Sequence, residues 1–71
     1  MKKILQIEGM TCGHCKMKVE NTLKALEGVA EVDVDLIDGK AEIELNEFIE
    51  DALLEKKIME AGYKITSIIE Q

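Results

Sequence analysis

The sequence contains no proline, no tryptophan and no arginine, and none of its apolar runs approaches a membrane-spanning length. A membrane helix needs roughly 18 consecutive apolar residues, so we expect no direct insertion into a membrane. The lack of arginine and the net charge of −6 argue against nucleic acid as a partner, because its phosphates need a continuous basic face. A chain of 71 residues also leaves little room for a deep substrate cleft. We therefore expect a binding protein and not an enzyme.

The first residues of the chain and its two cysteines bear on where the protein works. Met1-Lys2-Lys3 is followed by Ile4 to Glu8, a stretch too short and too polar for a secretory signal peptide. We therefore expect a cytoplasmic protein, in which nearby thiols are kept reduced. Cysteines in that setting indicate metal binding or redox chemistry and not a structural disulfide.

One stretch, Gly9-Met10-Thr11-Cys12-Gly13-His14-Cys15, holds both cysteines and the single histidine. Two thiols separated by two residues can converge on a soft metal ion or form a disulfide with each other. The stretch lies where a strand-like pattern changes to a helix-like one, which would put Cys15 in the first helical turn. Unpaired backbone N–H groups and the helix dipole stabilise a thiolate there and lower its pKa. On the residues alone, soft-metal binding and dithiol redox chemistry both remain open.

Hydrophobic periodicity predicts a strand and then a helix around this stretch. Leu5 and Ile7 alternate with polar residues, as in a half-buried strand, and Gly9 ends the alternation. The period then changes, which predicts a helix that begins at Gly13 and stops near Gly28. The expected apolar face of this helix comprises Cys15, Val19, Leu23 and Leu26.

The last third of the chain predicts a second helix and a final strand. The helix is expected somewhere between Glu47 and Ala61, with Asn46 or Asp51 as its N-cap and Gly62 just past its end. The strand is expected from Tyr63 to Ile69. Its isoleucines fall at both odd and even positions, so the sequence does not predict which of them face the core.

Between the helices, two alternating runs flank the dipeptide Asp38-Gly39. Such a dipeptide predicts a hairpin with a two-residue type I′ turn. The turn would place the apolar residues of the two runs opposite each other on one face. The acidic residues would meet on the other face, where like charges repel. The expected pairs are Leu36 with Ala41, Val34 with Ile43, Val32 with Leu45, Asp35 with Glu42 and Asp33 with Glu44.

The order strand, helix, strand, strand, helix, strand predicts an α+β fold. Two units of this size fit a ferredoxin-like βαββαβ sandwich, in which two helices cover one face of a four-stranded antiparallel sheet. No linker or low-complexity tract interrupts the pattern, so we expect residues 1–71 to form a single domain.

Charge is divided unevenly along the chain. Residues 1–26 carry five lysines against two acidic residues, a charge of +3, whereas residues 27–71 carry four lysines against thirteen acidic residues, a charge of −9. We therefore expect a dipolar molecule whose basic end holds the cysteines.

At the stretch Gly9–Cys15 the sequence resembles the heavy-metal-associated domain family, which comprises small copper chaperones and the N-terminal domains of copper-transporting P-type ATPases. The resemblance extends over the whole chain. Beyond the Gly-Met-x-Cys-x-x-Cys loop it includes Leu26-Glu27-Gly28-Val29 at the end of the first helix and Ala61-Gly62-Tyr63 at the end of the second.

The resemblance implies a carrier for Cu(I), which takes part in metal transport and copper homeostasis. Cys12 and Cys15 would bind the ion and pass it by thiolate exchange to a P-type ATPase metal-binding domain or a copper-responsive regulator. A metal-linked homodimer is a further state that it allows. Cu(I) accepts as few as two thiolates, whereas zinc normally takes four ligands. Zinc-specific members often carry an acidic residue where this chain has Thr11, which favours copper and leaves zinc, mercury and cadmium as alternatives.

The resemblance also assigns roles around the cysteines. Met10 would pack inward and support the loop together with Thr11 and Gly13, with its thioether as an alternative ligand. His14 lies between the two cysteines and is expected to point to solvent, with a role in tuning affinity or as an auxiliary ligand in a dimer as the alternatives. Tyr63 would lie near the metal loop, where it either contacts the site or packs in the core. The first helix would dock onto an acidic partner through Lys16 and Lys18.

A second class of protein shares the tetrapeptide Cys12-Gly13-His14-Cys15, which is the active-site sequence of protein disulfide isomerases. A thiol-disulfide oxidoreductase is therefore the alternative from another class. Those proteins resemble thioredoxin and need a tryptophan before the first cysteine and a cis-proline beside the pair. This chain contains neither residue and is too short for that fold.

Overall fold

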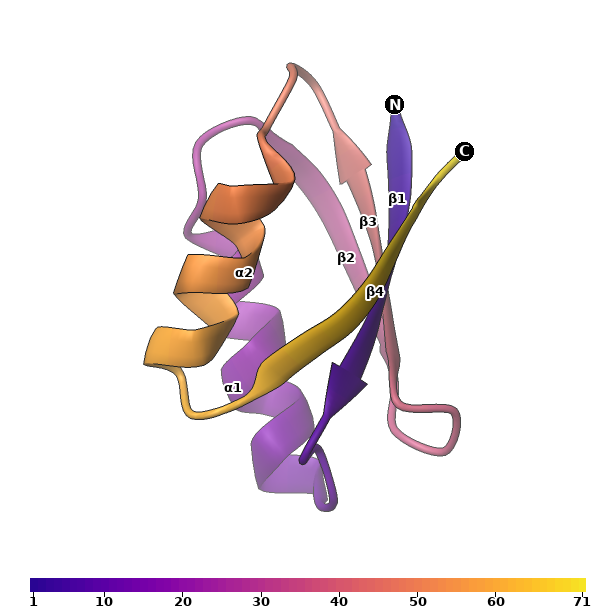
Figure 1. The fold of residues 1–71 in the computed structure, drawn as a ribbon, viewed down its shortest axis with the longest axis vertical. Helices are drawn as coiled ribbons and strands as arrows, with labels where there is room; N and C mark the ends of the chain where they lie inside the picture. Colours follow the sequence, from indigo (N-terminus) through magenta and orange to yellow (C-terminus); the bar gives the residue numbers. More distant parts are fainter.

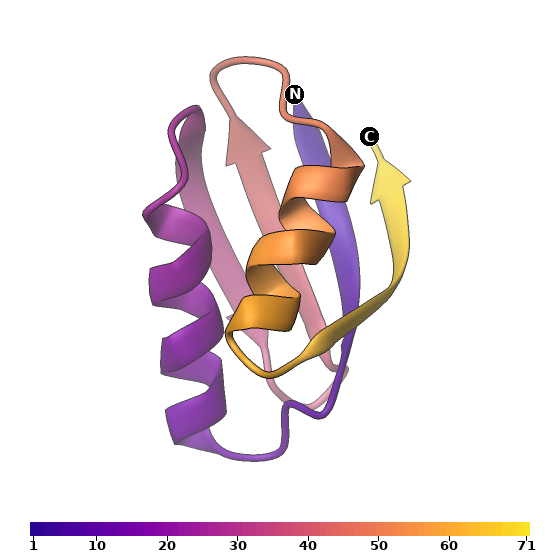
Figure 2. The same cartoon turned by 60° about the vertical axis from the view of Figure 1, so that its left-hand side comes forward.

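Four strands and two helices follow one another in the predicted order in the computed structural model, which describes all 71 residues. The strands form one antiparallel sheet in the order β2-β3-β1-β4, and both helices lie on the same face of it (Figures 1 and 2). The ferredoxin-like βαββαβ sandwich is therefore confirmed. Neither helix is long and apolar enough to cross a membrane. The elements are β1 (Lys2–Glu8), α1 (Gly13–Lys24), β2 (Val29–Asp35), β3 (Lys40–Leu45), α2 (Asp51–Glu60) and β4 (Lys64–Glu70).

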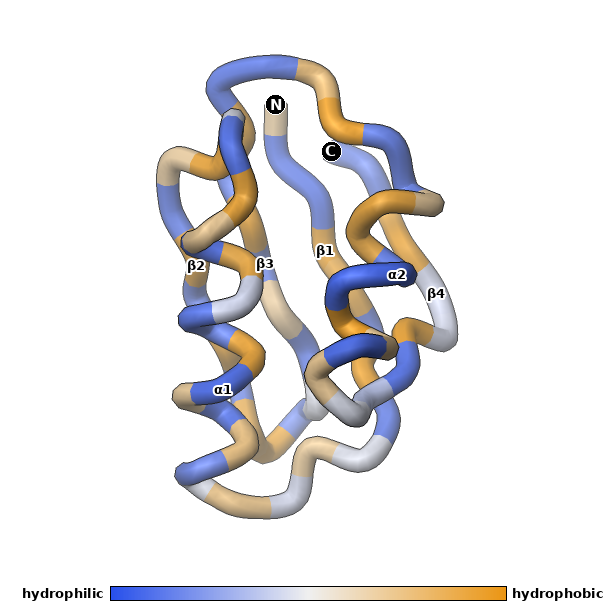
Figure 3. Tube along the Cα trace, turned by 90° about the vertical axis from the view of Figure 1, so that its left-hand side faces the viewer, coloured by the Kyte–Doolittle hydropathy of each residue, from blue (hydrophilic) through white to orange (hydrophobic).

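The core lies between the sheet and the two helices. Strand alternation and helical periodicity bring the apolar residues of every element to this layer, as the banding of hydrophobic and hydrophilic residues in Figure 3 illustrates. One charged residue, Lys3, is buried with them at 2% exposure. The large side chains with the least exposure are Leu5, Val19, Leu23, Ile43, Leu54 and Ile58.

The turn between β2 and β3 is longer than predicted. It spans residues Leu36–Gly39 and not the dipeptide Asp38-Gly39 alone. The Asp35 carboxylate explains the difference, because it accepts hydrogen bonds from the backbone N–H groups of Ile37 at 3.0 Å and Asp38 at 3.2 Å. An aspartate that bonds the backbone two and three residues ahead of it stabilises a wider turn.

The longer turn shifts the hairpin register by two residues, so the predicted pairs are wrong. Because the shift is even, the apolar residues still face the core. One predicted repulsion is replaced by an attraction, since Asp35 lies opposite Lys40. The observed pairs are Val34 with Ala41, Val32 with Ile43, Val29 with Leu45, Asp33 with Glu42 and Glu31 with Glu44.

The ambiguous parity of β4 has a physical cause. The pairing of β4 with β1 shifts between Gln6 and Ile7, which leaves Thr66 as an extra residue in β4. Such a bulge reverses the faces of the residues on either side of it. Ile65 and Ile68 consequently both lie opposite inward-facing residues of β1.

The helix ends agree only in part with the predicted caps. α1 ends at Lys24 with Ala25 as its C-cap, well before Gly28. The N-cap of α2 is Glu50, whose side chain makes no capping bond, so neither candidate N-cap was right. At its other end, Gly62 has φ +98°, and its N–H and that of the next residue return to carbonyls of the last turn. This is the predicted glycine stop, in the form of a Schellman motif.

Strand direction determines which residues share an end of the molecule. The β2–β3 turn lies beside the end of β1, where the N–H of Ile7 donates to a carbonyl of the turn at 2.8 Å. The turn brings Asp35 and Asp38 to the same end as the cysteine stretch (Figure 1). Lys2 and Lys24, from the basic part of the sequence, lie toward the opposite end. The predicted charge division is therefore weaker in space than along the chain.

Candidate metal centre

The two cysteines lie at the N-terminus of α1. Cys12 is the N-cap, in an extended conformation with φ −148° and ψ 167°, and its Sγ accepts a hydrogen bond from the N–H of Cys15 at 3.4 Å. A side-chain oxygen normally fills this capping role. Cys15 is therefore in the first helical turn, as predicted, and no acidic residue occupies that turn. The sulfurs supply the negative charge that the helix N-terminus favours.

The two sulfurs are close enough to act together. The Sγ atoms of Cys12 and Cys15 are 3.0 Å apart, and both thiols are free. Metal–sulfur bonds of about 2.3 Å each allow one ion to bridge sulfurs up to about 4.6 Å apart. Cys12 is exposed and Cys15 is half-buried against the core. One sulfur is thus held by packing, while the other can adjust to an incoming ion.

The environment of Cys15 favours its thiolate. A hydrogen bond with Cys12, an interaction with the Tyr63 hydroxyl and a backbone hydrogen bond from Thr11 lower the pKa of Cys15 from 9.0 to about 6. The same contact with Cys15, with burial, raises the pKa of Tyr63, whose phenol stays protonated and remains a donor. Cys15 is therefore poised to ionise near neutral pH, and the thiolate is the form that binds metals.

Some residues around the two cysteines pack in the core and support the loop, whereas others are exposed in the loop itself. Met10 is 6% exposed and belongs to the core cluster. Gly9 has φ +93°, and a Cβ there would lie 3.6 Å from Cδ1 of Tyr63, so the loop passes close to that ring. Thr11, Gly13 and His14 are exposed to solvent.

The pair has no further ligand beside it. No group of three or more histidine, cysteine or acidic side chains in the structure is arranged to hold a metal ion. His14 follows the N-cap by two residues and is not gathered with the sulfurs. The donor set is therefore two sulfurs, which fits an ion that accepts low coordination and leaves positions open to another molecule's ligands.

The two lysines proposed for docking lie on α1 just beyond the cysteines. Lys16 is half-buried and Lys18 is exposed. Residues two apart on a helix point to different sides, so the pair flanks the loop and does not form one patch. Farther along α1, Lys24 forms an ion pair with Glu20, one turn before it, at 3.3 Å.

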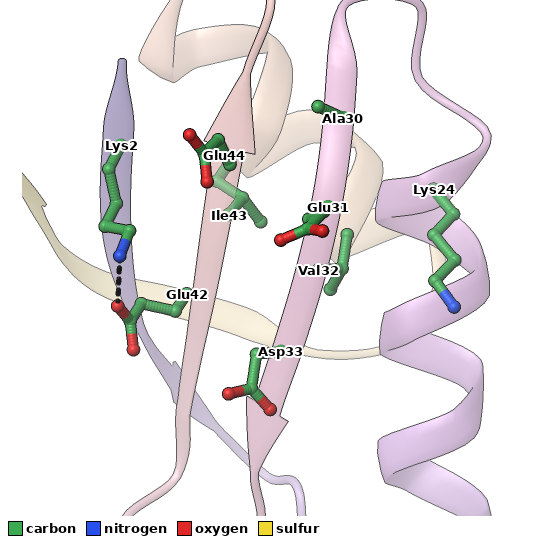
Figure 4. Close-up of a pocket in the computed structure, with 9 residues that line it drawn as sticks. All are labelled: Lys2, Lys24, Ala30, Glu31, Val32, Asp33, Glu42, Ile43 and Glu44. Atoms are coloured by element: carbon green, nitrogen blue, oxygen red, sulfur yellow. Dashed lines mark ion pairs between the residues drawn. The ribbon is translucent and has the colours of Figure 1, made fainter.

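Two features away from the cysteines were not foreseen. The largest hollow, about 470 Å³, lies along β2 and β3 and not beside the metal loop (Figure 4). The second is Lys3, whose Nζ donates to the carbonyl of Ile49 at 2.9 Å and to Asp51 Oδ1 at 2.6 Å. Lys3 shares the parity of Leu5 and Ile7 in β1, and this was the signal in the sequence that it faces inward.

Comparisons with known proteins agree with this geometry. The model of the heavy-metal-associated domain matches residues 4–64. The copper chaperone CopZ of Staphylococcus aureus (strain JH9) is 41% identical over 46 residues, which cover 65% of this chain and 68% of that protein. A solved CopZ metallochaperone is 33% identical and covers 93% of this chain and 100% of its own, with a TM-score of 0.86. The N-terminal domain of ZntA, solved in its Zn(II) form, is 31% identical over 90% of this chain and 86% of its own, with a TM-score of 0.81.

Proposed function

Because this chain belongs to the heavy-metal-associated domain family, we propose that it is a cytoplasmic copper chaperone and not an enzyme. Cys12 and Cys15 bind one Cu(I) ion as cargo. Residues 1–71 act as one domain, in which Met10, Gly13 and Tyr63 support the metal loop.

The observation that carries the proposal is the isolated pair of sulfurs. They lie 3.0 Å apart at a helix N-terminus, and no third side-chain ligand is gathered with them. A structural zinc site would need four ligands, and this chain offers two thiols. Cu(I) is soft and is satisfied by two thiolates. The similarity to a zinc-form domain keeps Zn(II) as the competing cargo.

Binding of Cu(I) to the two cysteines is coupled to the release of a thiol proton. The Sγ atoms of Cys12 and Cys15 are in hydrogen-bond contact at 3.0 Å, which places a proton on at least one of them before the ion binds. Metal ligands must be deprotonated, so binding releases that proton to solvent. Two thiolates and Cu(I) then carry about one negative charge, which the N–H groups of the first turn of α1 stabilise.

Transfer to an acceptor follows from the low coordination number. A thiolate of the acceptor forms a third bond to the ion, and one bond to Cys12 or Cys15 then breaks. Repetition with the acceptor's second thiolate moves the ion completely, with no change in its oxidation state. Cys12 is the exposed member of the pair and is the first to leave. The acceptor is a metal-binding domain of a copper-transporting P-type ATPase or a copper-responsive regulator.

Other contacts of the loop follow from the same chemistry. Lys16 and Lys18 flank the cysteines and attract an acidic acceptor surface. In concentrated protein, the sulfurs of a second copy can enter the same open positions and form a metal-linked homodimer. His14 and Thr11 lie exposed beside that contact.

Competitive titration of the reduced protein with Cu(I) and Zn(II) against chelators of known affinity tests the proposal. We expect one tightly bound Cu(I) per monomer and weaker binding of Zn(II). Cys12→Ser with Cys15→Ser abolishes tight binding and leaves the far-UV circular dichroism unchanged, because serine is also a good N-cap. His14→Ala is the matched control and retains the affinity of the native protein.

Three results would overturn this function. Tight Cu(I) binding in the double serine variant would place the ion elsewhere. Tighter binding of Zn(II) than of Cu(I) would make the protein a zinc carrier. Catalytic reduction of a protein disulfide at rates far above those of a free dithiol would favour the oxidoreductase alternative.

A further inference from the structure

β2 is an open edge of the sheet. It is the first strand in the order β2-β3-β1-β4 and pairs only with β3, so its backbone groups on the other side have no strand partner. The pairing is irregular between Val29 and Glu31 and regular from Glu31 to Asp35. A regular, unpaired edge of this kind is a template for another strand.

A hollow of about 470 Å³ runs along this edge. Figure 4 shows the carboxylates of Glu31 and Asp33 on β2, with Lys24 of α1 across the edge. The apolar side chains of Ala30 and Val32 also line it. The hollow therefore combines strand backbone, a small apolar floor and acidic flanks.

The carboxylates of the hollow are largely without counter-charges. Glu31 lies opposite Glu44, and Asp33 lies opposite Glu42, on the outer sheet face. Lys2 pairs with only one of these four, Glu42, at 3.1 Å. Lys24 is engaged with Glu20. Glu31, Asp33 and Glu44 make no ion pair, although Lys2 also attracts Glu31 and Glu44 at longer range. Four carboxylates thus share one lysine, and a cation brought to this edge meets net negative charge.

The other open edge is different. The bulge at Thr66 lies within β4 and interrupts its pairing, and bulges protect edges from pairing. The irregularity of β2 lies at its start and leaves Glu31 to Asp35 regular. The hollow beside β4 is also smaller, at about 180 Å³. A second copy of the chain does not suit the β2 edge either, because its own acidic β2 would face Glu31 and Asp33.

We propose that the β2 edge is a docking site for an extended basic segment of another protein, which adds to the sheet as a fifth strand. Lysine or arginine at alternate positions of that segment faces Glu31 and Asp33, and its backbone pairs with the open groups of β2. The charge that excludes a second copy therefore selects a basic partner. This site involves neither cysteine and does not rest on the proposed copper function.

Nuclear magnetic resonance with a short peptide that alternates lysine and valine tests the site. The metal-free Cys12→Ser, Cys15→Ser protein is used, which removes metal-linked contacts. We expect shift changes concentrated in residues 29–35 and slower hydrogen exchange of β2 amides that face away from β3. A peptide in which glutamate replaces lysine does not bind.

Charge reversal supplies the matched control. Glu31→Lys with Asp33→Lys lowers the affinity by about tenfold, as expected when two attractive pairs become repulsive. Glu55→Lys with Glu70→Lys makes the same change in net charge at exposed positions of α2 and β4, away from the edge, and retains most of the binding. Circular dichroism checks that all variants fold.

The outcomes separate the proposal from non-specific attraction. Shift changes spread over all acidic surfaces, or equal loss of affinity in both charge-reversed proteins, would overturn it. So would a native protein that sediments as a dimer in a manner abolished by changes in β2, because a second copy would then occupy the edge.

Discussion

The two helices begin at opposite ends of the molecule, and their first turns are stabilised in different ways. At α1 no acidic residue is present, and Cys12 Sγ accepts the hydrogen bond from the first turn. At α2 the first turn carries Asp51, which the buried Lys3 holds at 2.6 Å. Lys3 also lies 5.4 Å from the centre of the Phe48 ring. One N-terminus is thus left for a thiolate, while the other is fixed by an ion pair.

The N-terminus of α1 therefore contributes to metal binding, whereas the N-terminus of α2 contributes to the stability of the fold. The negative charge at α1 comes from the sulfurs of Cys12 and Cys15, which a cargo ion can bind and leave. The negative charge at α2 is tied to a core residue in β1 and cannot be exchanged. We therefore expect changes at α2 and in the core to alter the free energy of unfolding, and changes at α1 to alter metal chemistry with little effect on the fold.

The largest expected effect is on the free energy of unfolding, from a substitution in the core against which both helices pack. Ile43 is fully buried, so Ile43→Ala should lower the free energy of unfolding of the metal-free protein by about 2 to 4 kcal/mol. Ile37 is 96% exposed, and Ile37→Ala is the matched control, with a change of about 0.5 kcal/mol or less. Urea denaturation measures both. A metal-free protein that is already disordered would show that metal drives folding.

The second effect is on the free energy of unfolding, from removal of the ion pair at the N-terminus of α2. Lys3→Met removes the ion pair with Asp51 and leaves the buried carbonyl of Ile49 without its donor, which should cost about 1 to 3 kcal/mol. Lys2→Met breaks only the exposed pair with Glu42 and should lower the free energy of unfolding much less, because solvent screens an exposed ion pair. Equal effects of the two substitutions in urea denaturation would show that burial of Lys3 adds nothing.

The third effect concerns the approach of an acceptor to α1. Lys16→Glu and Lys18→Glu, singly and together, should slow Cu(I) transfer to an acceptor domain several-fold at low salt, and added salt should reduce the difference. Lys56→Glu with Lys57→Glu on α2 is the matched control. Stopped-flow measurement of transfer gives the rates. If the rate is indifferent to salt and to both reversals, the lysines of α1 only solvate the surface.

The smallest effect concerns the protonation of Cys15. Alkylation of Cys15 should rise through a midpoint near pH 6, and Tyr63→Phe should move the midpoint upward because a donor to the thiolate is lost. Because folding lowers the pKa of Cys15, its thiolate stabilises the folded state. This contribution is fully present above the ordinary pKa of 9.0 and is lost as the pH falls through about 6. Alkylation monitored by mass spectrometry measures the midpoint. An unchanged midpoint in Tyr63→Phe would show that the phenol does not influence the ionisation of Cys15.

Periodicity alone predicted the element order and the layer that each apolar residue joins, because burial of one face is a property of local sequence. It did not predict the hairpin register, since the hydrogen bonds of Asp35 to Ile37 and Asp38 compete with a two-residue turn. The bulge at Thr66 and the burial of Lys3 depend on partners distant in sequence. The position of Cys15 in the first helical turn was predictable from periodicity, whereas the proximity of Tyr63 to the loop was expected from the family resemblance alone.

The central claim is that the two sulfurs at the N-terminus of α1 form the complete coordination shell of one Cu(I) ion. X-ray absorption spectroscopy of a dilute one-to-one complex tests it most directly. We predict two sulfur neighbours and no nitrogen or oxygen neighbour, with the same spectrum in His14→Ala. A light-atom neighbour that disappears in His14→Ala, or a third sulfur that persists on dilution, would contradict the claim.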